Sequence, residues 1–191
     1  HLYEGIAQQV IADVIHLLKE LGIKRLIVTN AAGSLRKDLH PGSIMLIKDH
    51  INLSGKNPLI GVNDDNYGPR FPAMNNAYTP LLREHCRQIA AKKKITVEEG
   101  IYLMVLGPNF ETPAEIKAFS LLGADAVGMS TVPEVIAAAH SSMEVLGISV
   151  ITNYGAGLLA GAPSHTETVN EANKTSRSLT EILMEFIKEE D

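Results

Sequence analysis

The chain has 191 residues, of which 45% are hydrophobic and 20% are charged, and its formal net charge is −5. This length fits one domain, and the composition is ordinary for a globular protein. The negative balance argues against non-specific nucleic-acid binding, and we expect the basic run at residues 92–94 to be a solvated helix end. No apolar run approaches 18 residues and no signal peptide is recognisable, so we expect a soluble, cytoplasmic protein that binds no membrane.

The first half of the chain predicts a helix, two strands and a second helix. Apolar residues recur with helical spacing from Ile6 to Leu21. Residues 24–29 read as a buried strand, and the small residues at 30–34 predict a loop in which the backbone can approach a ligand. A shorter strand follows at residues 44–47. Residues 49–70 are rich in Asn, Gly and Pro and predict long loops, and residues 81–93 are helical.

After residue 100 the pattern alternates between strands and helices. We expect strands at 101–106, 124–129 and 146–152, and helices at 112–122, 132–143 and 166–188. Three helix starts carry capping-box spacing, at residues 112 and 115, 131 and 134, and 164 and 167. The alternation predicts the α/β class, with a mixed, largely parallel central sheet flanked by helices. We expect residues 1–191 to form a single domain.

The stretch from residue 123 to residue 134 predicts an anion site. It opens as an apolar strand and turns at Ser130 into a helix. Free backbone N–H groups and the positive end of the helix dipole would gather beside Met129 and Ser130. A serine hydroxyl placed there can donate to a phosphate oxygen. The alternative reading is a capped, buried helix that binds no ligand.

Other strand ends carry side chains that suit a flat, polar ring. Phe110 offers an aromatic face, and the dipole of the following helix should keep Glu111 ionised as an acceptor for a ligand N–H. Asn153 offers a donor and an acceptor, and His165 could donate to a hydroxyl. Each has a structural alternative, in the core, a turn or a cap, but their joint appearance at strand ends favours a binding site.

Neither a metal nor a dinucleotide is expected. The histidines lack ligand spacing and form no His/Cys cluster, and the single cysteine, Cys86, reads as a small core residue. Glycines at 155, 157 and 161 resemble a dinucleotide fingerprint, but Pro163 interrupts the segment before the helix begins.

Several short motifs follow one another along the chain. They are His-Leu-Tyr-Glu-Gly at 1–5, Thr-Asn-Ala-Ala-Gly at 29–33, Asp-His-Ile-Asn at 49–52, Arg-Phe-Pro-Ala-Met at 70–74, Gly-Pro-Asn-Phe-Glu-Thr at 107–112, Val-Gly-Met-Ser-Thr-Val-Pro-Glu at 127–134 and Ile-Thr-Asn at 151–153. In this order they resemble the motifs of the trimeric purine nucleoside phosphorylases. The resemblance implies phosphorolysis of a purine nucleoside to the free base and ribose 1-phosphate in purine salvage, with inorganic phosphate as co-substrate and no cofactor or metal.

The resemblance also implies a role for each matching residue. Phosphate would be held by His1, the backbone N–H of Ala31 and Ser130, with Glu4 supporting His1. The nucleoside would be bound by Tyr3, Phe110, Glu111, Met129, Asn153 and His165. Phe71 would reach into a neighbouring subunit's site, which implies a homotrimer. The catalytic residues would be Asn153, His1 and Glu111, with Asn153 bonding N7 of the departing purine as it gains a proton.

Two alternatives remain open at this point. Glu111 with Asn153 favours 6-oxopurines such as hypoxanthine and guanine, whereas relatives that cleave methylthioadenosine carry aspartate near the asparagine; a preference for xanthosine is the other possibility within the family. The second alternative is a non-catalytic, purine-binding fragment. Family members have an N-terminal segment with further phosphate-binding residues, and this sequence begins after it, so we expect a domain that is N-terminally incomplete relative to the family.

Overall fold

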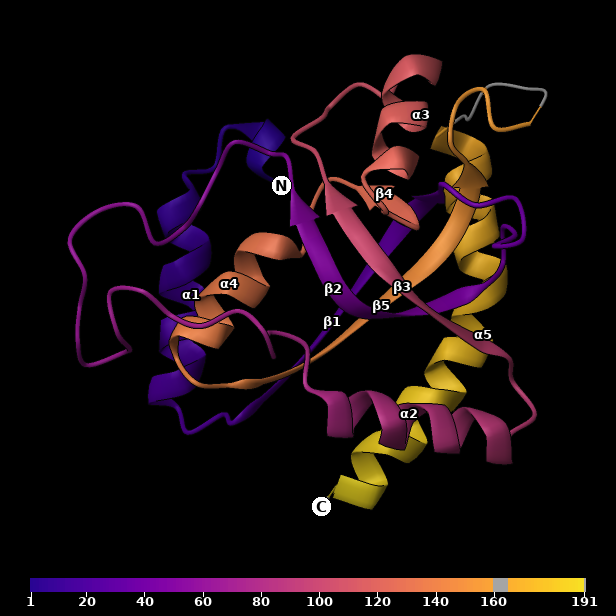
Figure 1. Ribbon diagram of the computed structural model, residues 1–191. Coiled ribbons are helices and arrows are strands. Elements are labelled where there is room, and N and C mark those ends of the chain that lie inside the picture. The colour runs from indigo at the N-terminus through magenta and orange to yellow at the C-terminus, as the bar shows by residue number, and fades with distance from the viewer. Residues whose placement is uncertain (160–164, 191) are drawn as a thin grey trace.

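The computed structural model describes residues 1–159 and 165–190, with the side chains of residues 165–174 and 190 left out of that description. In this part of the chain a central sheet of five strands is surrounded by helices (Figure 1). The strands are β1 (Arg25–Ser34), β2 (Ile44–Asn52), β3 (Val97–Met104), β4 (Ala126–Gly128) and β5 (Glu144–Tyr154). The helices are the 3₁₀ turn η1 (Leu2–Glu4), α1 (Gln8–Glu20), α2 (Pro80–Lys92), α3 (Pro113–Leu121), α4 (Val132–His140) and α5 (His165–Glu190).

The sheet is mixed and curls back on itself. β1 runs parallel to β5, and β3 runs parallel to both β2 and β4. The pairs β2–β5 and β1–β4 are antiparallel, and the strand order β1-β4-β3-β2-β5 closes because β5 returns to β1. Most of the paired residues lie in parallel ladders, which confirms the predicted fold class. The nearly continuous burial of β5 is typical of a strand covered on both faces.

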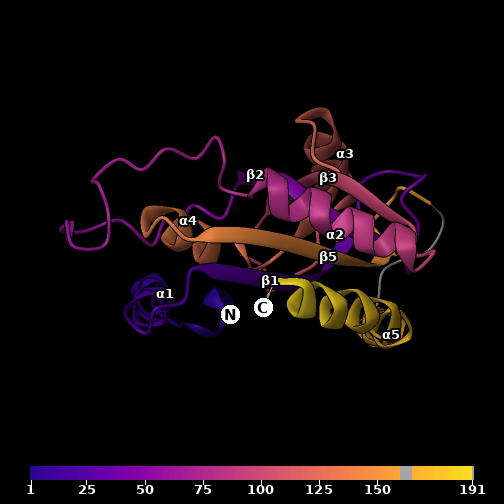
Figure 2. The same ribbon diagram turned by 90° about the horizontal axis from the view of Figure 1, so that it is seen from below.

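Helices bury separate parts of this sheet. α1 packs with α4, and α5 packs against β5 and α2 (Figure 1). Seen from below, α1 and α5 lie on the same side of β1 (Figure 2).

The prediction for Cys86 is confirmed, since its side chain is fully buried between α2 and α5 in a cluster with Ile89 and Phe186. α1 is a helix as predicted and buries Ala12 and Ile15, but Val10, Val14 and Leu17 on the helix remain exposed, as does Leu21 just after it.

Several strand boundaries differ from the prediction. β1 continues to Ser34, so the predicted loop at residues 30–34 is wrong. β2 continues to Asn52, so the first residues of the predicted long loop are strand as well. In both cases the extension is stabilised by a parallel neighbour, β5 for β1 and β3 for β2, which local sequence does not reveal. β4 is shorter than predicted and spans only Ala126–Gly128.

Candidate active site

The turn between β4 and α4 is held in an unusual conformation. Thr131, the residue before α4, has a φ of 78°, in the left-handed region that β-branched residues avoid. Its side chain makes no capping bond, so the capping box predicted with Glu134 is wrong. Instead, the Thr131 hydroxyl accepts a hydrogen bond from Asn30 Nδ2 at 2.9 Å and lies 3.1 Å from Ser130 Oγ. Such strain persists only where surrounding contacts fix it, and it is frequent at functional sites.

The other predicted capping boxes have different outcomes. At α3 the Thr112 hydroxyl accepts from the Glu115 amide at 3.2 Å, and the Glu115 carboxylate accepts from the Thr112 amide at 2.7 Å, which confirms that box. The box predicted at residues 164 and 167 lies outside the described residues.

Tyr102 of β3 contacts the turn between β4 and α4 through its hydroxyl. Its ring is fully buried, and its hydroxyl accepts the backbone N–H of Ser130 at 3.3 Å. Burial raises the pKa of Tyr102, so the hydroxyl stays protonated at neutral pH. Gly128 makes room for it, because a Cβ at that position would lie 2.4 Å from the Tyr102 hydroxyl oxygen. The Ser130 amide is therefore engaged within the protein, and only part of the predicted set of free N–H groups is available to an anion.

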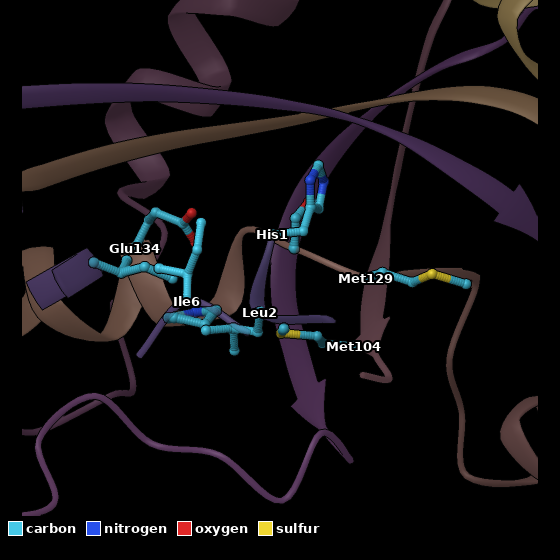
Figure 3. A pocket seen from close by; sticks show the side chains of 9 residues that line it. His1, Leu2, Ile6, Met104, Met129 and Glu134 are labelled. Carbon is cyan, nitrogen blue, oxygen red and sulfur yellow. The ribbon is translucent and has the colours of Figure 1, made fainter. Parts of the chain in front are cut away.

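A cavity of about 290 Å³ lies beside this turn. It is lined by His1, Leu2, Ile6, Ile11, Met104, Met129, Ser130, Pro133 and Glu134. In Figure 3 His1 lies between Glu134 and Met129, with Leu2 and Met104 beneath it. The His1 ring stacks on Tyr3, with 4.9 Å between ring centroids, and the Glu4 carboxylate bonds the backbone nitrogen of His1. His1 and Leu2 thus meet the turn at Ser130, which is distant in sequence, at one cavity.

Glu134 is a cavity residue that sequence reasoning missed. Its Oε2 is buried and has no hydrogen-bond partner among the described residues. The spacing from Thr131 assigned Glu134 to a capping box, and the unusual φ of Thr131 removes that partner. No sequence pattern indicates that Glu134 lines the cavity, because the spacing of a capping box is the same whether or not the box forms.

Glu111 lines a second cavity, of about 430 Å³, with Gly107 and Asn109. Burial is the largest influence on Glu111 and raises the pKa of its carboxyl, so the predicted effect of the helix dipole does not dominate. Phe110 is 40% exposed beside it. Gly107 lies close to the first cavity as well, because a Cβ at its position would be 2.3 Å from the sulfur of Met129, which lines that cavity. Its φ is +72°.

Asn153 lies at an irregularity near the end of β5. Ala32 pairs with Ile151 and Gly33 pairs with Asn153, so β5 contains one extra residue, Thr152, as in a β-bulge. Asn153 Oδ1 accepts from the Thr152 hydroxyl at 2.9 Å, and its Nδ2 donates to the Tyr154 carbonyl at 3.0 Å. Gly33 leaves space for this amide, since a Cβ there would lie 3.1 Å from Asn153 Nδ2.

Asn153 is not among the described residues that line the two cavities. β1 and β5 run opposite to the strands they adjoin, β4 and β2, so the carboxyl ends of the five strands do not all lie at one edge of the sheet. The two groups of residues approach each other instead through the antiparallel pair of Gly33 with Val127, which connects the end of β1 to β4.

The remaining predicted residues are more dispersed. Ala31 lies within β1, next to Asn30. Phe71 is 88% exposed and lines a separate cavity of about 440 Å³, with the Arg70 guanidinium carbon 6.0 Å from its ring centroid. His165 is the first residue of α5, but its side chain lies outside the described residues.

The part of the chain that the structure describes contains neither a cluster of metal-ligand side chains nor a membrane-spanning helix. Residues 1–159 and 165–190 contain no group of three or more His, Cys, Asp or Glu that could hold a metal ion. In the same part of the chain, none of the helices combines the length and apolar character that crossing a bilayer requires.

Comparison with known proteins places this fold and site in a family. Residues 4–188 match the sequence profile of the phosphorylase superfamily, so the chain belongs to that superfamily. Over 188 residues it is 44% identical to purine nucleoside phosphorylase 1 of Geobacillus stearothermophilus, covering 98% of this chain and 69% of the relative. It is 48% identical over 160 residues to the purine nucleoside phosphorylase of Mus musculus, covering 80% of this chain and 55% of the relative. The chain thus belongs to the purine nucleoside phosphorylases.

Solved structures agree with this assignment. A Schistosoma purine nucleoside phosphorylase in complex with hypoxanthine superimposes with a TM-score of 0.95 at 37% identity, covering 98% of this chain and 69% of that one. The same coverage of this chain and the same TM-score are found for a Schistosoma purine nucleoside phosphorylase in complex with guanosine. The chain therefore spans between about half and about two thirds of the length of these relatives.

Proposed function

We propose that this chain carries the phosphorolytic site of a purine nucleoside phosphorylase. In this reaction phosphate attacks the anomeric carbon of the nucleoside, the glycosidic bond breaks, and ribose 1-phosphate and the free purine are released. The observation that carries the proposal is the meeting of His1, Met129 and Ser130 at one cavity beside the strained turn that precedes α4. Relatives with 37–48% identity bear the name of this enzyme.

Phosphate binding is assigned to the Ser130 side of the cavity. The N-terminus of α4 supplies a positive dipole end, and Ser130 and His1 supply side-chain donors. The backbone N–H of Ala31 is proposed as a further donor. Positive charge develops on the sugar as the glycosidic bond breaks, and an anion held beside it stabilises that charge. Met129 and Tyr3, on the same side, would contact the ribose, and His165 its 5′-hydroxyl.

Purine binding is assigned to the neighbouring cavity and the end of β5. Phe110 would pack on the ring, Glu111 would accept from its N–H edge, and Asn153 would bond N7 and O6. The close approach of Gly107 to Met129 supports this division, because Gly107 lines the cavity that contains Glu111 and Met129 lines the cavity that contains Ser130. We propose 6-oxopurine nucleosides as substrates. Related Schistosoma enzymes have been solved with inosine and with adenosine, so these two nucleosides are the informative comparison.

The test of this function is the release of hypoxanthine from inosine. Release should require added phosphate, and it should be slower from adenosine. Asn153→Ala should lower kcat by roughly 10²–10³-fold, the usual cost of one transition-state donor. Asn66→Ala, on an exposed loop, is the matched control and should leave kcat unchanged. A protein that releases no base with phosphate present would exclude the proposal.

A non-catalytic purine-binding role is the second candidate, motivated by the partial coverage of the relatives. It predicts that this chain binds hypoxanthine without turning over inosine. Comparing these residues alone with the complete natural coding sequence decides between the two, because phosphate-dependent release by both excludes the binding-only role. Purine salvage in the cytoplasm is our prediction for the setting of the activity.

We further propose that the enzyme acts as a homotrimer in which Phe71 completes a neighbouring subunit's site. The exposure of 88% of this large apolar side chain supports an intermolecular role. Phe71→Ala should then raise the KM for inosine while leaving the thermal stability unchanged, and analytical ultracentrifugation should give the mass of a trimer. A monomeric protein with full activity would contradict this proposal.

A further inference from the structure

Three polar side chains form a chain of contacts that ends at the cavity. Asn30 of β1 donates from Nδ2 to the Thr131 hydroxyl at 2.9 Å, and the Thr131 hydroxyl lies 3.1 Å from Ser130 Oγ. Thr131 is only 4% exposed, so water does not compete freely for its hydroxyl. Ser130 lines the cavity. The contacts therefore run from the half-buried amide of Asn30 to the side chain that is assigned to phosphate.

The hydrogens that each of these three side chains carries determine which of them can donate in each contact. A hydroxyl carries one hydrogen to donate and two lone pairs that accept. Because the Thr131 oxygen accepts from the Asn30 amide, its own hydrogen is available to donate to Ser130 Oγ. Either hydroxyl can be the donor in that contact. When Thr131 donates, Ser130 Oγ is the acceptor and the Ser130 hydrogen is available to a second partner.

A phosphate in the cavity is the stronger of the two remaining acceptors for the Ser130 hydroxyl hydrogen. Tyr102 is the other hydroxyl neighbour: its oxygen accepts the Ser130 backbone N–H at 3.3 Å and also interacts with the Ser130 side chain, so it competes with a ligand for the Ser130 hydrogen. An anionic phosphate oxygen is a stronger acceptor than a neutral phenol, because a hydrogen bond to a charged group is roughly twice as strong. The strained φ of Thr131 has a function in this arrangement, since it turns the hydroxyl away from the α4 cap and toward Asn30.

We propose that Asn30 and Thr131 are positioning residues that orient the Ser130 hydroxyl hydrogen toward phosphate. This inference rests on the proposed function, because it takes phosphate as the ligand of Ser130. Neither residue touches phosphate; both act through Ser130. Without them the Ser130 hydroxyl would be free to point its hydrogen at Thr131 or Tyr102, and phosphate would lose a preorganised donor.

The test uses the protein expressed with its complete natural coding sequence and separates the KM for phosphate from the KM for inosine. Thr131→Val keeps the β-branched shape but removes the hydroxyl, and it should raise the KM for phosphate about 10-fold or more, the effect of losing one hydrogen bond to a charged group. The KM for inosine should change less than twofold. Thr131→Ser, which restores a hydroxyl, should return the KM for phosphate close to that of the wild type.

A double-mutant cycle with Ser130→Ala shows whether the effect passes through Ser130. Adding Thr131→Val to Ser130→Ala should not raise the KM for phosphate further. Asn30→Ala, on a different element, repeats the cycle if Thr131→Val does not fold. Additive effects in the cycle, or an equal rise in the KM for inosine, would overturn the positioning role. A wild-type protein without phosphate-dependent activity would instead refute the proposed function, so the two failures are distinguishable.

Discussion

Gly128→Ala should destabilise the protein by about 1–3 kcal/mol, the range for overpacking a well-packed core. A Cβ at this position would lie 2.4 Å from the Tyr102 hydroxyl oxygen and 3.1 Å from two of its ring carbons. All of these distances are shorter than ordinary van der Waals contact. Tyr102 is fully buried, so its ring cannot move into solvent to make room. The added methyl group must displace either the ring or the strand.

Urea unfolding measures this cost, and a double-mutant cycle identifies its origin. For a chain of this size, 2 kcal/mol corresponds to a fall in Tm of about 4–8 °C. In a Tyr102→Phe background the closest contact disappears, so Gly128→Ala should cost about 1 kcal/mol less than in the wild type. An equal cost in both backgrounds would refute the reasoning, because it would show that the hydroxyl does not resist the methyl group.

Three predictions concern ionisable groups whose pKa is shifted by full or partial burial. Burial raises the pKa of Glu111, so its stabilising contribution is complete at acid pH and is lost as the pH rises through the folded-state pKa. In urea titrations Glu111→Gln should therefore gain stability relative to the wild type as the pH rises above the ordinary carboxyl pKa of 4.5. Burial, followed by the nearby His140, lowers the pKa of His16 against the opposing effect of Asp13 and Asp64. Stability should therefore fall as the pH drops below 6.5, and the fall should be smaller in His16→Gln; an unchanged pH profile in either variant would contradict the assigned cause. Burial raises the pKa of Cys86 to about 11, so a thiol reagent at pH 8 should label it only after unfolding, and rapid labelling of the native protein would contradict its burial.

Helices were predictable from the sequence because their signals are local. The apolar spacing of α2 and the capping box at Thr112 each depend on residues within a few positions of one another. Ordered motifs likewise identified the family before any fold was known, since each motif is a short contiguous string. The cavity residues His1, Met129 and Ser130 all belong to such strings.

The residues at which strands end were less predictable, because pairing with the neighbouring strands of the sheet determines them. Nothing in residues 30–34 indicates that β1 continues through them; the parallel ladder with β5 extends it. The bulge that repositions Asn153 also depends on the register between two strands separated by more than 100 residues. Which strands of the mixed sheet are antiparallel was unpredictable for the same reason, since strand direction is a property of the whole sheet.

The sequence by itself determined the α/β class, the family and the identities of the residues assigned to substrate, because local periodicity and contiguous motifs carry that information. Only the tertiary structure decided how those residues are arranged. It brings Asn30 of β1 to Thr131, gives Thr131 a left-handed φ, engages the Ser130 amide with Tyr102 and leaves Oε2 of Glu134 buried without a partner among the described residues. The contacts of Asn30 with Thr131 and of Tyr102 with Ser130 join elements that are distant in sequence, and only the packing of the closed sheet brings such elements together.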